Sequence, residues 1–176
     1  MTSSCRWIVK GIPIIIIVAC IMHYAYALSG NLTIVGLFAS VNESVFEHLK
    51  LSFWPMLIWW IIGYLIHYVR ISSKNWFTAA TVALVICPLF ITAFYYTYTG
   101  AFGIHSLFLD ISSLVIGVII AQYLALHIYI HARIGLIGLI ISLIILLLLI
   151  FFSIYFTLNP PHFPLFMDSL MGRYGM

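Results

Sequence analysis

The sequence predicts an all-α fold: an integral membrane bundle of five transmembrane helices with a polar first outer loop and a short C-terminal tail. Hydrophobic residues make up 65% of the chain and charged residues only 6%, which leaves too little polar surface to cover a water-soluble domain. The apolar residues also form long segments, each close to the about 20 residues that a helix needs to cross a bilayer. Residues 1–176 are therefore interpreted as a single transmembrane domain.

The predicted helices are separated by short polar or glycine-containing connections. They cover residues 11–28, 51–68, 76–98, 104–130 and 134–158, with the outer loop at 29–50 and the tail at 159–176. A cleavable signal sequence is the alternative for the first segment, because Ala25-Tyr26-Ala27 has the small-x-small pattern of a cleavage site. The polar His23 within that segment, and the spans that follow it, favour a retained helix.

Composition supports each of the later helices. The second is rich in tryptophan, and the third ends in an aromatic and hydroxyl belt at residues 94–99, as expected where hydrocarbon meets lipid headgroups. A glycine turn at residues 100–103 leads into the fourth. The fifth is apolar on nearly every side, which favours contact with lipid. Its Gly135 and Gly138 offer a surface for a second copy of the chain or a membrane partner protein.

Basic residues predict the orientation, because lysine and arginine gather on the cytoplasmic side of membrane proteins. With a cytoplasmic N-terminus, most of them fall inside: Arg6, Lys10, Arg70, Lys74 and Arg133. Lys50 and Arg173 fall outside. The sequence thus predicts a multi-pass protein of the cell membrane with an extracytoplasmic C-terminus. The net charge of +3 is explained by this placement, so no nucleic-acid partner is predicted, and membrane lipid is the expected partner.

The same orientation, which uses lysine and arginine alone, places every acid on the outer side: Glu43, Glu47, Asp110 and Asp168. Acids contribute little to topology. Their shared location therefore needs a separate explanation.

One stretch, Val41–Pro55, gathers polar residues at the mouth of the second helix. It holds Glu43 and Glu47, spaced four residues apart, with His48 and Lys50 beside them. On a helix this spacing places both carboxylates on one face. Two ionised acids there repel each other unless a cation, a shared proton or a basic partner lies between them. Lys50 is interpreted as a poor partner, since its spacing suits Glu47 but not Glu43.

Two residues of the fourth helix, His105 and Asp110, are expected to reach the same membrane level. With the outer loop they give an inventory of carboxylates and imidazoles that suits a divalent metal, zinc or manganese, or a two-metal centre. The predicted metal ligands are Glu47, His48, His105 and Asp110. The candidate catalytic residues are Glu43 and Glu47, with Glu43 as the general base.

These acids also have structural interpretations. The sequence Ser40-Val41-Asn42-Glu43 matches a capping box, in which Glu43 would only start a helix. Asp110 shares a helix face with Ser113 and Gly117, and this face is expected to point into the bundle. An acid at that depth either belongs to a site or pairs with a tyrosine or histidine.

Other histidines are interpreted without a metal. His127 and His131 have ligand spacing on a helix, but no acid lies on their side of the membrane, which favours interfacial histidines. His162 lies in the proline-rich start of the tail. That tail either folds back over the outer site as a lid or lies on the membrane surface as an amphipathic segment.

Two groups of residues carry a resemblance to a known family. They are Asn42–Lys50 with the following Phe53-Trp54-Pro55, and Pro160–Asp168 with the closing Gly172-Arg173-Tyr174-Gly175. At these positions the chain resembles a family of small bacterial polytopic membrane proteins catalogued only as a domain of unknown function. The resemblance covers nearly the whole length. It implies a bacterial integral membrane protein without an established activity, and it carries over no catalytic residues.

Three classes of function follow from these observations. The first is a metal-dependent enzyme that acts on a lipid or lipid-linked substrate at the outer leaflet. The second is a small transporter or channel component in which the same carboxylates bind a proton or cation. The third is a structural or partner membrane protein without catalysis, whose polar cluster only holds the first loop to the fourth helix.

Overall fold

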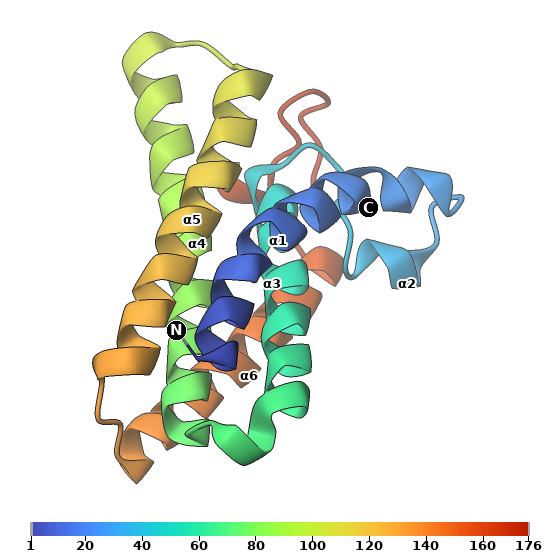
Figure 1. Cartoon of the computed structure of the whole chain (residues 1–176). Helices are drawn as coiled ribbons and strands as arrows, with labels where there is room; N and C mark the ends of the chain where they lie inside the picture. Colours follow the sequence, from blue (N-terminus) through green and yellow to red (C-terminus); the bar gives the residue numbers. More distant parts are fainter. Residues whose placement is uncertain (1, 176) are drawn as a thin grey trace.

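The computed structural model describes residues 2–175, so Met1 and Met176, the ends of the predicted domain, lie outside the described residues. All the named elements of the described chain are helical, and none is a strand. The helices are α1 (Ser3–Leu28), α2 (Thr33–Gly36), α3 (Val45–His67), α4 (Ser73–Phe102), α5 (Leu107–His131) and α6 (Leu136–Leu158), with 3₁₀ turns η1 (Tyr68–Arg70) and η2 (Pro164–Phe166). Figure 1 shows the long helices as one bundle and α2 as a short helix beside the end of α1.

Five helices of the described chain are long and apolar enough to cross a membrane: α1, α3, α4, α5 and α6. This confirms the predicted fold class, an all-α bundle with five candidate spans. The central helix is α4, which packs against α3, α5 and α6, while α1 packs against α3 and α5. Small buried residues such as Ala79, Ala83 and Ala121 allow these helices to approach closely.

Several helices begin earlier than the sequence predicts, because a hydroxyl side chain caps each of them. The Ser44 hydroxyl accepts a hydrogen bond from the Glu47 amide at 3.3 Å, so α3 begins at Val45 rather than at residue 51. The hydroxyl of Thr2 likewise accepts from Cys5, and α1 begins at Ser3 rather than at residue 11. Each cap satisfies an amide of a first turn, which otherwise has no partner. The consequence is that part of the predicted outer loop belongs to α3.

A tryptophan clasp joins the antiparallel helices α1 and α3. The indole rings of Trp7 and Trp59 stack with their centroids 4.1 Å apart. Each indole N–H donates to the backbone carbonyl of the other tryptophan at 3.2 Å. Gly11 faces the ring of Trp59, and Gly63 faces the ring of Trp7. A Cβ atom at either glycine would collide with the facing indole. A Trp-x-x-x-Gly spacing on each helix thus fixes how the two helices meet.

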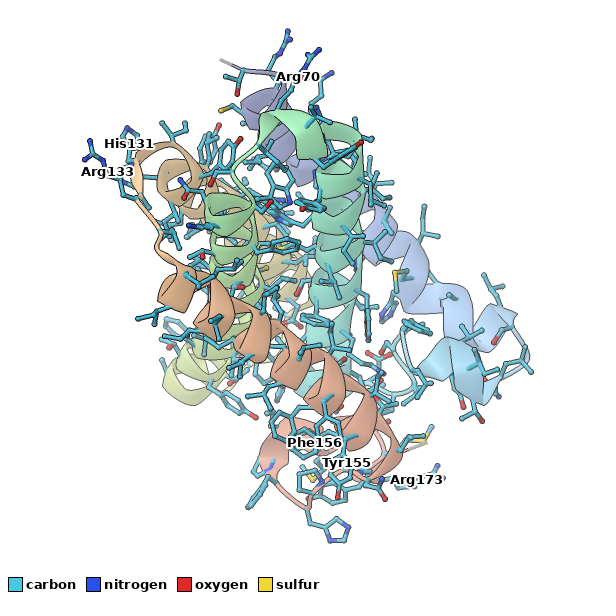
Figure 2. The ribbon with its side chains drawn as sticks, turned by 90° about the horizontal axis from the view of Figure 1, so that it is seen from below. Arg70, His131, Arg133, Tyr155, Phe156 and Arg173 are labelled. Carbon is cyan, nitrogen blue, oxygen red and sulfur yellow. The ribbon has the colours of Figure 1, made fainter. Side chains whose placement is uncertain are left out.

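The two ends of the bundle differ in charge. Figure 2 shows Arg70 and Arg133 at one end and Arg173, with Tyr155 and Phe156, at the other. The start of α3, which Glu43 directly precedes, lies toward the second end, as do the C-terminal tail and the α4–α5 turn. The candidate functional residues therefore share the end opposite to most basic residues, as the sequence predicts.

We expect Gly63→Ala to destabilise the fold by about 1–3 kcal/mol, because the added methyl group overpacks the tryptophan clasp. The measurement is the thermal midpoint of the purified protein in detergent. Gly100→Ala is the matched control, since Gly100 is helical and a Cβ atom there would meet nothing within 4 Å. In that open position alanine should be neutral or stabilising, because it favours helix more than glycine does. A midpoint for Gly63→Ala at or above the wild-type value would contradict the clasp.

Candidate functional site

A buried ion pair organises the end of the bundle where α3 begins. The Lys50 ammonium lies 2.6 Å from the Glu47 carboxylate, and the two side chains are only 2% and 4% exposed. The interpretation of Lys50 as a poor partner is therefore wrong. Because α3 begins at Val45, Glu47 and Lys50 lie three residues apart on one helix face, where side chains meet. Glu43 precedes the helix, so the two glutamates do not share a helical face.

The same pair ties the first loop and α6 to α3. The second acceptor of Lys50 is the Gly36 carbonyl at 2.7 Å, and the third is the Thr157 hydroxyl at 2.9 Å. All three ammonium protons thus have an acceptor. The Glu47 carboxylate also accepts from the Val41 amide at 2.9 Å. A buried charge is tolerated only when it is paired and hydrogen-bonded, and both charges of this pair meet that condition. The same hydrogen bonds hold the two ends of the segment 36–41.

The anchored loop brings Glu43 between two histidines. One carboxylate oxygen of Glu43 lies 3.3 Å from Nε2 of His48, and the other lies 3.9 Å from Nε2 of His23. The ligand atoms of all three residues lie within 4.8 Å of one another. His23 comes from α1, Glu43 from the loop and His48 from α3. We call these three residues the His–Glu–His cluster.

Backbone contacts orient His48 and Glu43. Nδ1 of His48 lies 2.9 Å from the Ser44 carbonyl, an acceptor, so Nδ1 carries a proton. Nε2 faces the Glu43 carboxylate and donates to it when the ring is protonated. The side-chain oxygen of Asn42 accepts from the Ser44 amide at 2.9 Å, which fixes the turn before α3. A histidine whose far nitrogen is held by a carbonyl is the usual arrangement of a metal ligand.

The cluster is half-buried, with side-chain exposures of 29% for His23, 36% for His48 and 41% for Glu43. The hydrogen bond with His48 lowers the pKa of Glu43, and burial opposes this effect. Glu43 therefore stays ionised to lower pH than an ordinary glutamate. A carboxylate that remains charged and partly accessible between two imidazoles can bind either protons on those rings or a metal ion.

A hollow of about 450 Å³ adjoins the cluster. His23 and Glu43 form part of its wall. The rest of the wall is uncharged and comes from the end of α1 and the first loop: Tyr24, Tyr26, Ala27, Asn31, Ser40, Val41 and Asn42. A ligand atom bound by the cluster would thus have open space on the side of α1.

The structure does not bring His105 or Asp110 into the cluster. The Tyr98 hydroxyl donates to the Asp110 carboxylate at 2.7 Å, which matches the pairing with a tyrosine considered from the sequence. The exposed His105 instead lies 3.3 Å from the Tyr95 hydroxyl through Nδ1. These contacts join α4 to α5 across their turn. Of the predicted metal ligands, His48 alone belongs to the His–Glu–His cluster.

The structure also revises the interpretation of neighbouring residues. Ser44 rather than Ser40 caps α3, so the predicted capping box at Glu43 is wrong. His23 is the cluster member that the sequence did not predict as a ligand. Its signal was its position: a polar residue within an apolar segment, near the end that carries the acids. At the other end, the rings of His127 and His131 stack with centroids 4.4 Å apart, outside any cluster of three ligands found among the described residues.

Comparison with known proteins places the chain in a family. No curated protein and no solved structure matches it. A model of a family of unknown function, DUF6512, matches residues 1–176. This confirms the resemblance seen in the motifs around Glu47 and His162. The chain belongs to the family of unknown function DUF6512.

Proposed function

We propose that this protein binds a divalent metal ion, for which zinc fits best, through His23, Glu43 and His48. The observation that carries the proposal is the convergence of three ligand atoms within 4.8 Å from three separate segments. Two imidazoles and one carboxylate form a ligand set of catalytic zinc sites, which keep a fourth position open. Manganese is less well suited, because it favours a shell of oxygen ligands.

The distances support zinc after a small adjustment. Ligand atoms of one tetrahedral zinc lie roughly 3.4 Å apart, given zinc–ligand bonds of about 2.0–2.1 Å. The distance from His48 to Glu43 is already 3.3 Å, and the distance from His23 to Glu43 is 3.9 Å. The ligand atoms of the two histidines lie within 4.8 Å of each other, so closing the cluster needs His23 to move toward both Glu43 and His48. Its partial exposure leaves room for that movement.

Glu47 has a structural role in this proposal. Its carboxylate is occupied by Lys50 and the Val41 amide, so it holds the loop instead of binding metal. Glu43 becomes a ligand, whereas the sequence suggested a general base. The rival interpretation of the cluster is a metal-free hydrogen-bonded group, with protonated histidines around an ionised Glu43. Metal binding distinguishes the two.

The hollow favours a second, more specific candidate: a metal-dependent enzyme acting on a lipid or lipid-linked substrate. Its lining is polar but uncharged around Asn31 and Asn42, and the exposed apolar side chains of Leu28 and Leu32 lie in the same segment. Such surroundings suit an amphipathic molecule at the membrane interface. When bound, zinc supplies Lewis-acid activation at its open position.

Transport has weaker support. The buried charged residues of the described chain are Glu47, Lys50 and Asp168. All three lie at this end of the bundle, so they do not form a path across the membrane.

We expect purified wild-type protein to bind about one zinc ion per chain. Glu43→Gln and His23→Ala should lose most of that zinc, because each removes one of three ligands. His105→Ala is the matched control and should keep it, although the sequence placed His105 in the site. Elemental analysis after equilibration with zinc gives the stoichiometry. Acidification should release the metal, because imidazole and carboxylate ligands bind it only when deprotonated. Equal zinc in wild type and Glu43→Gln would contradict the proposal.

We further propose that the cluster lies on the extracytoplasmic side of the cell membrane, with the N-terminus in the cytoplasm. The support is the charge difference between the two ends, since basic residues favour the cytoplasmic end.

The orientation predicts which sites are reachable from outside the cell. In a chain whose native cysteines are replaced by alanine, Leu170→Cys in the tail should react with a membrane-impermeant maleimide in intact cells. Val69→Cys at the opposite end should react only after permeabilisation. Both positions are well exposed, at 79% and 77%, so exposure does not explain a difference. The reverse labelling pattern would overturn the orientation.

A further inference from the structure

The C-terminal tail folds back onto the start of α3. Phe166, in η2, is 7% exposed. Its ring lies 4.7 Å from that of Phe46 and 5.2 Å from that of Phe156, measured between centroids. In Figure 1 the tail, drawn in red, lies beside the cyan loop that leads into α3. The tail is thus anchored by an aromatic residue beside the site and does not extend freely along a membrane surface.

Beyond this anchor the tail forms a compact turn. Met167 and Tyr174 pair as an antiparallel bridge. The Asp168 amide donates to the Arg173 carbonyl at 2.8 Å, and the Asp168 carboxylate accepts from the Leu170 and Met171 amides at 2.8 and 3.0 Å. These local hydrogen bonds hold the turn in one shape, so its outward contacts are well defined.

Two hydrogen bonds join the tail to adjacent residues of the loop, Asn42 and Glu43. The Ser169 hydroxyl donates to the carbonyl of Glu43 at 3.1 Å. The side-chain amide of Asn42 donates to the carbonyl of Gly175 at 2.9 Å. Asn42 also caps the turn before α3 through its other side-chain atom. The main chain of Glu43 is therefore held by the tail while its carboxylate points at the histidines.

We infer that docking of the C-terminal tail and metal binding by the His–Glu–His cluster are coupled, so that each stabilises the other. The inference rests on the proposed zinc site. It adds that the C-terminal tail regulates metal binding at that site. Coupling between two binding events is reciprocal. If the docked tail fixes Glu43 for the metal, then metal bound at Glu43 must make undocking of the tail less favourable by the same factor.

The tail provides a readout of docking that does not use the metal as its signal. Arg173 is exposed and is followed by Tyr174, so trypsin cleavage there removes the last residues and changes the mass of the intact chain. We expect zinc to slow this cleavage by about 5-fold or more, within the usual range of allosteric coupling. Cleavage after Arg70 and Lys74, at the opposite end, is the internal control and should not depend on zinc. Glu43→Gln should abolish the protection.

The converse measurement is zinc affinity, determined by competition with a fluorescent zinc chelator. Ser169→Ala should weaken zinc binding by about 2- to 10-fold, as expected for one lost hydrogen bond. Phe166→Ala, which removes the aromatic anchor, should weaken it by about 10-fold or more, as loss of supporting contacts does at other metal sites. Leu170→Ala is the matched control, since Leu170 lies in the same turn with a side chain 79% exposed.

The outcomes separate the inference from the proposed function. Full zinc affinity in Ser169→Ala and Phe166→Ala, together with cleavage after Arg173 that zinc does not slow, would overturn the coupling and leave the metal site standing. Absence of zinc binding in the wild type would overturn both. Weakened affinity in these variants, normal affinity in Leu170→Ala and zinc-dependent protection of Arg173 would support the coupling.

Discussion

The structure of the end of the bundle where α3 begins depends on one interaction, the buried ion pair between Glu47 and Lys50. Both side chains are almost fully buried in an apolar protein, where an unpaired charge would be strongly destabilising. The pair is satisfied only because the loop supplies the Val41 amide and the Gly36 carbonyl, and because α6 supplies the Thr157 hydroxyl. The requirement to satisfy two charges thus determines where the loop lies, and the loop determines where Glu43 lies.

Segments far apart in sequence converge as a result. α1 contributes His23, the loop contributes Glu43, α3 contributes His48 and the tail contributes Ser169, which holds the carbonyl of Glu43. The tryptophan clasp joins α1 and α3, the two helices that carry the histidines, toward their opposite ends. In this arrangement the buried Glu47 and Lys50 hold the structure, whereas the carboxylate of Glu43 remains partly exposed between the two histidines.

The sequence predicts the spans well, because each is a long apolar segment whose composition permits little else. It predicts the site only in part. Placing the start of the second span at residue 51 missed the cap at Ser44. The spacing of Glu47 and Lys50 was recognised, but their ion pair was not predicted. His23 was missed because its partnership with Glu43 depends on how α1 packs against α3, a tertiary contact without a sequence spacing. Asp110 accepts a hydrogen bond from Tyr98, a contact that depends on the local geometry of the α4–α5 turn and that the sequence offered only as one of two alternatives.

The central claim is that the Glu47–Lys50 pair builds the site without belonging to it. Zinc affinity of the double variant Glu47→Leu/Lys50→Met tests this most directly. Apolar residues of similar volume often replace a buried ion pair without loss of the fold, and all three proposed ligands, His23, Glu43 and His48, are retained. We expect the helical content to match that of the wild type while zinc binding weakens by about 10-fold or more, as when supporting contacts of a metal site are lost. Wild-type zinc affinity in the folded double variant would contradict the claim.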